Sequence, residues 1–135
     1  MSELKDAGHT ESDPDTAIPL LILATCPVEN RPEGTPRLWG KLNLRITPGS
    51  LAFRIYQSLT AEEPFTCNYE LNPIYRGMLE ETGLKVSAVS KDGGARIVEL
   101  SARRFFLATG FVPQLMSDET RPHPIIVAFL EAAAA

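Results

Sequence analysis

The chain has 135 residues, of which 44% are hydrophobic and 22% charged, and its formal net charge is -4. This composition is typical of one soluble globular domain, and the negative charge argues against a surface for nucleic acid or anionic lipid. No apolar run approaches the roughly 20 residues that cross a bilayer, and the N-terminus lacks signal-peptide order, so we expect a cytoplasmic protein.

The N-terminal part changes character near residue 17. Residues 1–16 contain five acidic side chains and little apolar content, which predicts a flexible acidic tail before a globular domain over residues 17–135. The continuous apolar run Ile18–Ala24 predicts a strand buried on both faces. After a proline-rich loop, polar and apolar residues alternate over residues 38–46, which predicts a half-buried strand.

The middle of the chain shows two helix starts. Ser50 follows a Thr-Pro-Gly turn and can cap a short helix over Leu51–Ser58. Aromatic residues over Phe65–Glu70 indicate a strand. Asn72 then precedes a proline, which favours a helix starting there, and Gly83 ends that helix.

The C-terminal part predicts a hairpin, a strand and a helix. Asp92-Gly93-Gly94 separates two strand patterns at residues 85–89 and 95–100, and another strand pattern covers residues 104–109. A final helix starts at Pro124, and we expect four of its apolar residues to face the core: Ile125, Ile126, Phe129 and Leu130. This order predicts a single α/β domain, with a mixed β-sheet and flanking helices.

One stretch resembles a known family. Residues 105–114 read F-F-L-A-T-G-F-V-P-Q, and residues 121–124 read R-P-H-P. The stretch resembles the end of the class I glutamine amidotransferase domain of CTP synthases, where the pattern is F-F-x-A-T-Q-F-H-P-E and then S-R-P-x-x-P-H-P. Collinear similarity covers roughly residues 65–131, including N-Y-E-L-N-P-I-Y-R at residues 68–76. It is looser over residues 18–57, and we see none in residues 1–16.

The resemblance implies a flavodoxin-like α/β fold, of which this chain matches the second half. The catalytic His and Glu of the family fall on Val112 and Gln114, which can neither carry the proton nor supply the charge that a catalytic triad needs. The family's nucleophilic cysteine lies in a G-x-C-x-G motif, and that motif occurs nowhere in this chain. We therefore expect a degenerate site without glutaminase activity.

The two cysteines, Cys26 and Cys67, leave an alternative open. Two thiols cannot complete a zinc site, and a cytosolic domain of this size needs no disulfide, so we expect inert thiols, no metal and no cofactor. The segments around Cys26 and Cys67 also resemble those of small bacterial proteins that are related to the C-terminal region of CTP synthase. The alternative is a thiol-dependent enzyme that uses Cys67 or Cys26 as its nucleophile.

Several polar residues are candidate ligand contacts, although we expect a structural role for the last of them: Asn68, Tyr69, Glu70, Arg121 and His123. The resemblance also implies that the first half of the family's sheet has no counterpart in this chain. An open strand edge would remain, so we expect a homodimer or a protein partner that covers it. A further alternative is a regulatory or small-molecule-binding partner in nucleotide or glutamine metabolism.

Overall fold

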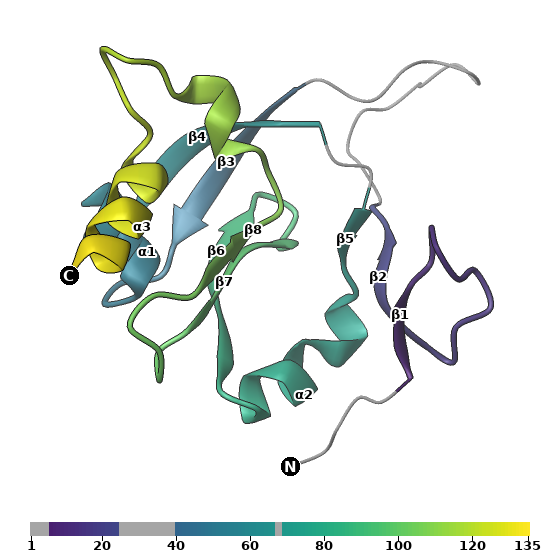
Figure 1. The fold of residues 1–135 in the computed structure, drawn as a ribbon. Coiled ribbons are helices and arrows are strands. Elements are labelled where there is room, and N and C mark those ends of the chain that lie inside the picture. The colour runs from purple at the N-terminus through teal and green to yellow at the C-terminus, as the bar shows by residue number, and fades with distance from the viewer. Residues whose placement is uncertain (1–5, 25–39, 67–68) are drawn as a thin grey trace.

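A computed structural model of the chain describes residues 6–24, 40–66 and 69–135. Their strands form two sheets (Figure 1). The smaller sheet has the order β1 (Ala7–His9), β2 (Ile18–Leu23), β5 (Tyr69–Leu71), and the larger has the order β4 (Thr60–Phe65), β3 (Gly40–Ile46), β6 (Leu84–Ser90), β7 (Ala95–Leu100), β8 (Leu107–Thr109). Strands β1 and β2 run parallel, and the other pairs run antiparallel. The predicted α/β architecture is confirmed, with its strands divided between two sheets.

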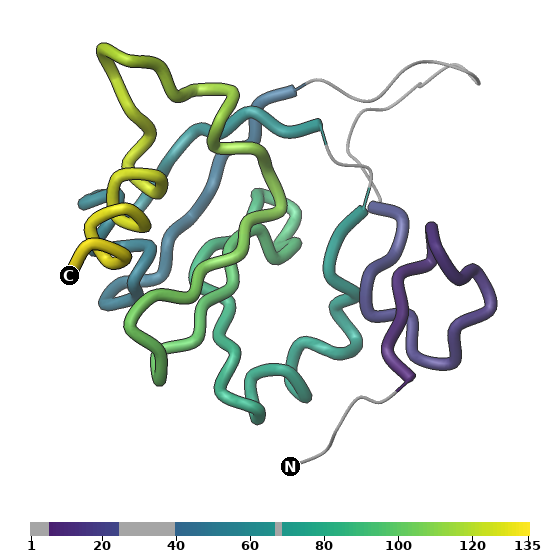
Figure 2. Tube along the Cα trace, in the orientation of Figure 1, coloured from purple at the N-terminus to yellow at the C-terminus, as the bar shows by residue number. Residues whose placement is uncertain are grey.

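The helices lie at two ends of the larger sheet. Helices α1 (Leu51–Tyr56) and α3 (Pro124–Ala134) pack against each other at one end of it (Figure 1). A 3-10 turn, Pro73–Tyr75, leads into α2 (Arg76–Glu81), which carries the chain from the smaller sheet into β6 (Figure 2). A second 3-10 turn, Pro113–Met116, connects β8 to the loop before α3.

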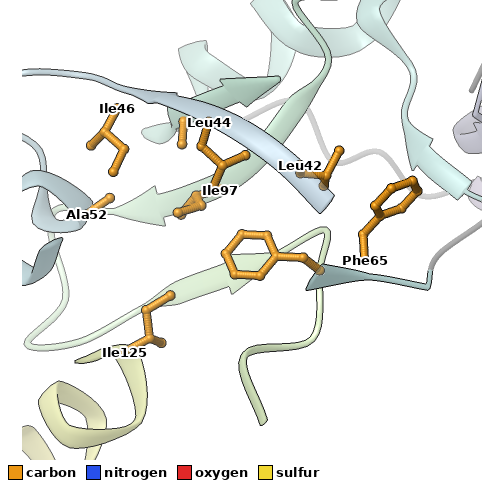
Figure 3. Packing of buried hydrophobic residues seen from close by; sticks show 9 residues of the cluster. Leu42, Leu44, Ile46, Ala52, Phe65, Ile97 and Ile125 are labelled. Atoms are coloured by element: carbon orange, nitrogen blue, oxygen red, sulfur yellow. The ribbon is translucent and has the colours of Figure 1, made fainter. Parts of the chain in front are cut away.

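The core lies on one face of the larger sheet. As predicted, β3 alternates, so that Leu42, Leu44 and Ile46 are buried while the residues between them are exposed. These side chains pack with further buried residues from the other elements (Figure 3): Ala52, Phe65, Ala88, Ile97, Phe111 and Ile125. Burying each of the larger side chains stabilises the fold by roughly 1.5–3 kcal/mol.

Both predicted helix starts are confirmed. Ser50 Oγ accepts a hydrogen bond of 3.0 Å from the Phe53 amide, and Asn72 Oδ1 accepts one of 3.1 Å from the Ile74 amide. Gly83 follows the second helix with a positive φ of 93°, which glycine adopts at little cost. Helix α1 ends two residues earlier than predicted, because Gln57 takes a left-handed conformation with a φ of 51°.

Three predicted strands differ from the observed ones. Strand β2 is half-buried rather than buried on both faces, and its Leu23 is 64% exposed. The strand predicted over residues 65–70 is instead the end of β4 and, from Tyr69, β5. The stretch before Phe65 contains two glutamates and Pro64, yet it forms β4 at the edge of its sheet, where proline is tolerated. Strand β8 is also shorter than the predicted segment 104–109.

Part of the segment that the sequence predicts to be a flexible acidic tail, residues 1–16, is a strand in the structure. Ala7–His9 form β1, and the Thr10 amide donates a 3.1 Å hydrogen bond to the Leu21 carbonyl. A polar segment can join a sheet in this way, because strand pairing uses backbone groups rather than buried side chains.

Candidate functional site

An open groove of about 690 Å³ lies between β8 and α3. Strand β8 ends the larger sheet and, among the described strands, pairs only with β7, so the groove adjoins a free sheet edge. Val112 and Gln114, the two positions that the sequence predicts to be degenerate, are among the residues that line it: Phe105, Leu107, Thr109, Phe111, Val112, Pro113, Gln114, Ile125, Ile126 and Phe129. This groove is the candidate site that the resemblance points to.

The chemistry of the groove is apolar. Val112 is half-buried, and its amide donates a 3.4 Å hydrogen bond to the Pro64 carbonyl, while Gln114 is exposed. None of the described residues that line the groove carries a titratable side chain. The Thr109 hydroxyl donates to the Phe111 carbonyl at 2.9 Å. The groove can therefore bind apolar surface, but its described lining supplies no acid, base or thiol.

The expected orientation of α3 is only half right. Ile125 is buried at 8% exposure, as predicted, but Phe129 and Leu130 are 54% and 59% exposed. The centroids of the Phe129 and Phe105 rings lie 5.7 Å apart in an edge-on arrangement. Both rings line the groove, and the Phe129 side chain remains exposed on its other side. Helix α3 thus carries apolar side chains that the described part of the chain leaves exposed.

His123 is held in a buried network beneath α3. Its Nδ1 accepts a 3.2 Å hydrogen bond from the Ile125 amide, which caps the helix. The proton must then be on Nε2, which donates to Glu63 Oε1 at 2.8 Å. The Tyr56 hydroxyl donates to the same oxygen at 2.5 Å. His123 therefore has a structural role, and neither it, Glu63 nor Tyr56 lines the groove.

Burial of Tyr56, together with the hydrogen bond and the negative charge of Glu63, raises the pKa of the Tyr56 phenol well above its usual range. The phenol thus remains a donor at neutral pH. Sequence reasoning missed Glu63, although a signal was present: Glu63 shares one face of its strand with the apolar Ala61 and Phe65.

Among the described residues, the other sequence candidates belong either to β5 or to the loop before α3. Cys26, Cys67 and Asn68 lie outside the described residues, so the thiol-enzyme alternative stays a prediction. The Tyr69 ring packs on the His9 ring with 4.4 Å between centroids, within the smaller sheet. Glu70 forms a buried ion pair with Arg96 at 3.1 Å, which ties β5 to β7.

Arg121 belongs to an exposed loop, where its amide donates to Asp118 Oδ1 at 2.8 Å. Hydrogen bonds from the Thr120 hydroxyl and from the Arg121 and Thr120 amides lower the pKa of the Asp118 carboxyl. This arrangement closes the loop between Asp118 and Arg121. In the described part of the chain, no three His, Cys, Asp or Glu side chains gather as metal ligands would.

Known proteins resemble the whole chain. It is 38% identical over 133 residues to the CTP synthase of Caldivirga maquilingensis and 37% identical over 133 residues to that of Nostoc punctiforme, and each match covers 98% of the chain. The solved glutaminase domain of Trypanosoma brucei CTPS with bound acivicin superposes with a TM-score of 0.85 at 28% identity, over 96% of the chain. The chain is homologous to the glutaminase domain of CTP synthase. No family model matches it.

The match covers only part of these relatives. The chain spans 24% of the length of the two CTP synthases and 51% of the solved glutaminase domain. Because 98% of this chain is aligned, the similarity extends into the acidic segment, and the expectation of no resemblance in residues 1–16 is wrong. No helix in the described ranges is long and apolar enough to span a membrane.

Proposed function

We propose that this chain is a non-catalytic, glutamine-amidotransferase-like module that acts by binding. The observation that carries the proposal is the groove between β8 and α3, which contains Val112 and Gln114 and no titratable side chain among its described residues. Amide hydrolysis by a triad needs a nucleophile, a base that takes its proton and a group that orients the base. Losing the nucleophile or the base alone lowers turnover on the order of 10⁶-fold in a comparable triad.

The same groove has the properties of an interaction surface. Along its open edge, β8 pairs with no other described strand, and the exposed Phe129 ring of α3 lies beside it. Free edges next to apolar surface are normally covered in stable proteins.

The occupant that we propose is a second copy of this chain. A two-fold axis would place two β8 edges side by side in antiparallel pairing and would bring each Phe129 onto the other copy's groove. Such an interface is self-complementary, because each copy supplies both an edge and an aromatic side chain.

Sedimentation velocity over a concentration series tests this assembly. We expect a dimer at micromolar concentration, and we expect Phe129→Glu to weaken dimerisation by roughly tenfold or more, because a charge would enter an apolar interface. Leu59→Glu is the matched control, since Leu59 is also 54% exposed but does not line the groove. A monomer at high micromolar concentration, or equal effects of the two substitutions, would contradict the assembly.

A further inference from the structure

A second pocket, on another part of the larger sheet, is rich in positive charge. It has a volume of about 260 Å³ and lies where the turn before α1 meets β6 and the segment after β7. Four of its residues are cationic: Arg54, Lys85, Arg103 and Arg104. Their gathering is notable in a chain whose net charge is -4, and it creates a local field that attracts anions.

Three of these cations have no anionic partner in the described part of the chain. The side chains of Arg54, Lys85 and Arg103 form no ion pair with any described residue, and all three residues are exposed. Arg104 differs, because its Nη1 donates a 2.9 Å hydrogen bond to an Ala135 oxygen. As far as the described residues go, the pocket therefore offers three unpaired positive charges to a ligand.

The carboxylate that lines the pocket is already engaged. Glu99 is buried, and its two oxygens accept hydrogen bonds of 2.9 Å and 3.2 Å from the Leu51 and Ala52 amides. Lys85 stands opposite Glu99 in the β6–β7 register, yet no ion pair joins them. Glu99 thus lowers the net positive charge of the pocket, but it forms no ion pair with the described cations that line it.

A buried hydroxyl in the pocket also lacks a partner. Ser87 is 1% exposed, it is among the lining residues, and its Oγ makes no hydrogen bond with any described group. Buried hydroxyls in folded proteins are normally hydrogen-bonded, and an unpaired one calls for a water, an ion or another ligand that satisfies it. This observation is independent of the charges and points to the same place.

We infer that this pocket binds a phosphate group, either as free inorganic phosphate or as a small phosphate monoester. A doubly charged tetrahedral anion can accept from guanidinium, ammonium and hydroxyl donors that approach from several sides. The volume equals that of roughly nine water molecules at about 30 Å³ each, which accommodates a phosphate with a few attached atoms. The site is separate from the groove between β8 and α3, so it does not depend on the proposed dimer.

Isothermal titration of the intact protein with inorganic phosphate and with glycerol 3-phosphate tests the site, against chloride and acetate at equal ionic strength. We expect saturable binding of phosphate and none of the control anions. Tighter binding of glycerol 3-phosphate would identify a phosphate monoester as the ligand, and equal or weaker binding would identify free phosphate. No saturable binding of either compound would overturn the proposal.

Two substitutions and two matched controls locate the binding. Arg103→Gln and Lys85→Met each remove one charged donor, and we expect each to weaken binding by about tenfold. Arg121→Gln and Lys91→Met change exposed cations outside the pocket and should leave affinity unchanged. Equal losses in all four variants would show general attraction of anions rather than a site, and the proposal would fail.

Discussion

At the scale of single residues, the most informative side chain is a buried carboxylate. Glu63 is 2% exposed, and one of its oxygens accepts from both Tyr56 and His123, while Glu63 Oε2 has no hydrogen-bond partner among the described residues. A buried charge with so few donors depends strongly on each of them. The network links α1, β4 and α3, and it fixes the start of the helix that forms one wall of the groove.

The Tyr56 hydrogen bond should be measurable as stability. We expect Tyr56→Phe to lower the free energy of unfolding by about 1.5–3 kcal/mol, the usual range for a hydrogen bond to a charged group. Tyr75→Phe is the control, because the Tyr75 hydroxyl has no hydrogen-bond partner among the described residues. Urea denaturation measures both variants, and equal losses would show that the Glu63 contact contributes nothing.

The same contact predicts a dependence on pH. Because the folded-state pKa of Tyr56 is raised above the usual value near 10, its stabilisation is fully present below pH 10 and is lost as the pH rises further. The slope is at most about 1.4 kcal/mol per pH unit, and it is smaller to the extent that solvent screens the partly exposed ring. The difference between wild type and Tyr56→Phe, followed from pH 9 to pH 11, isolates this term, and a constant difference would contradict it.

At the scale of elements, the ion pair between Arg96 and Glu70 connects the two sheets. The Arg96 and Glu70 side chains are 4% and 9% exposed, and Arg96 Nε also donates to Ser90 Oγ at 3.1 Å. Glu70→Gln would leave the Arg96 charge buried without its counter-charge, so we expect a loss of about 3–5 kcal/mol in the free energy of unfolding.

A surface pair provides the comparison for this prediction. Glu62 pairs with Lys41 at 2.6 Å, but the two side chains are 48% and 73% exposed. Glu62→Gln should therefore cost no more than about 1 kcal/mol. Chemical denaturation of the two variants measures the contrast, and similar losses would mean that the Arg96–Glu70 pair does not hold the sheets together.

Local rules predicted the elements that carry their own signals. The caps at Ser50 and Asn72, the hairpin around Asp92-Gly93-Gly94 and the alternation of β3 all follow from chemistry within a few residues. β1 and β4 could not be predicted in this way, because polar strands are stabilised by pairing with neighbours that are distant in sequence. The groove itself was only partly predictable. The family motif at residues 105–114 located Val112 and Gln114. The exposure of Phe129 could not be predicted, because it depends on which distant parts of the chain pack against α3.

At the scale of the whole molecule, the chain has the fold of a glutaminase domain over half the length of the solved example, with a TM-score of 0.85. Its structure combines a packed core beneath β3, β6 and β7 with an open apolar groove at the β8 edge. The proposed binding function places its contact surface in this groove. The positively charged pocket is a separate proposed site for a phosphate group.

The most direct test of this interpretation is ammonia release from glutamine by the purified protein. We expect no release above the rate of spontaneous hydrolysis, because Val112 cannot accept a proton and Gln114 cannot stabilise a charged base. An active glutaminase in the same assay controls for detection. Sustained turnover of glutamine by this chain alone would contradict the central claim.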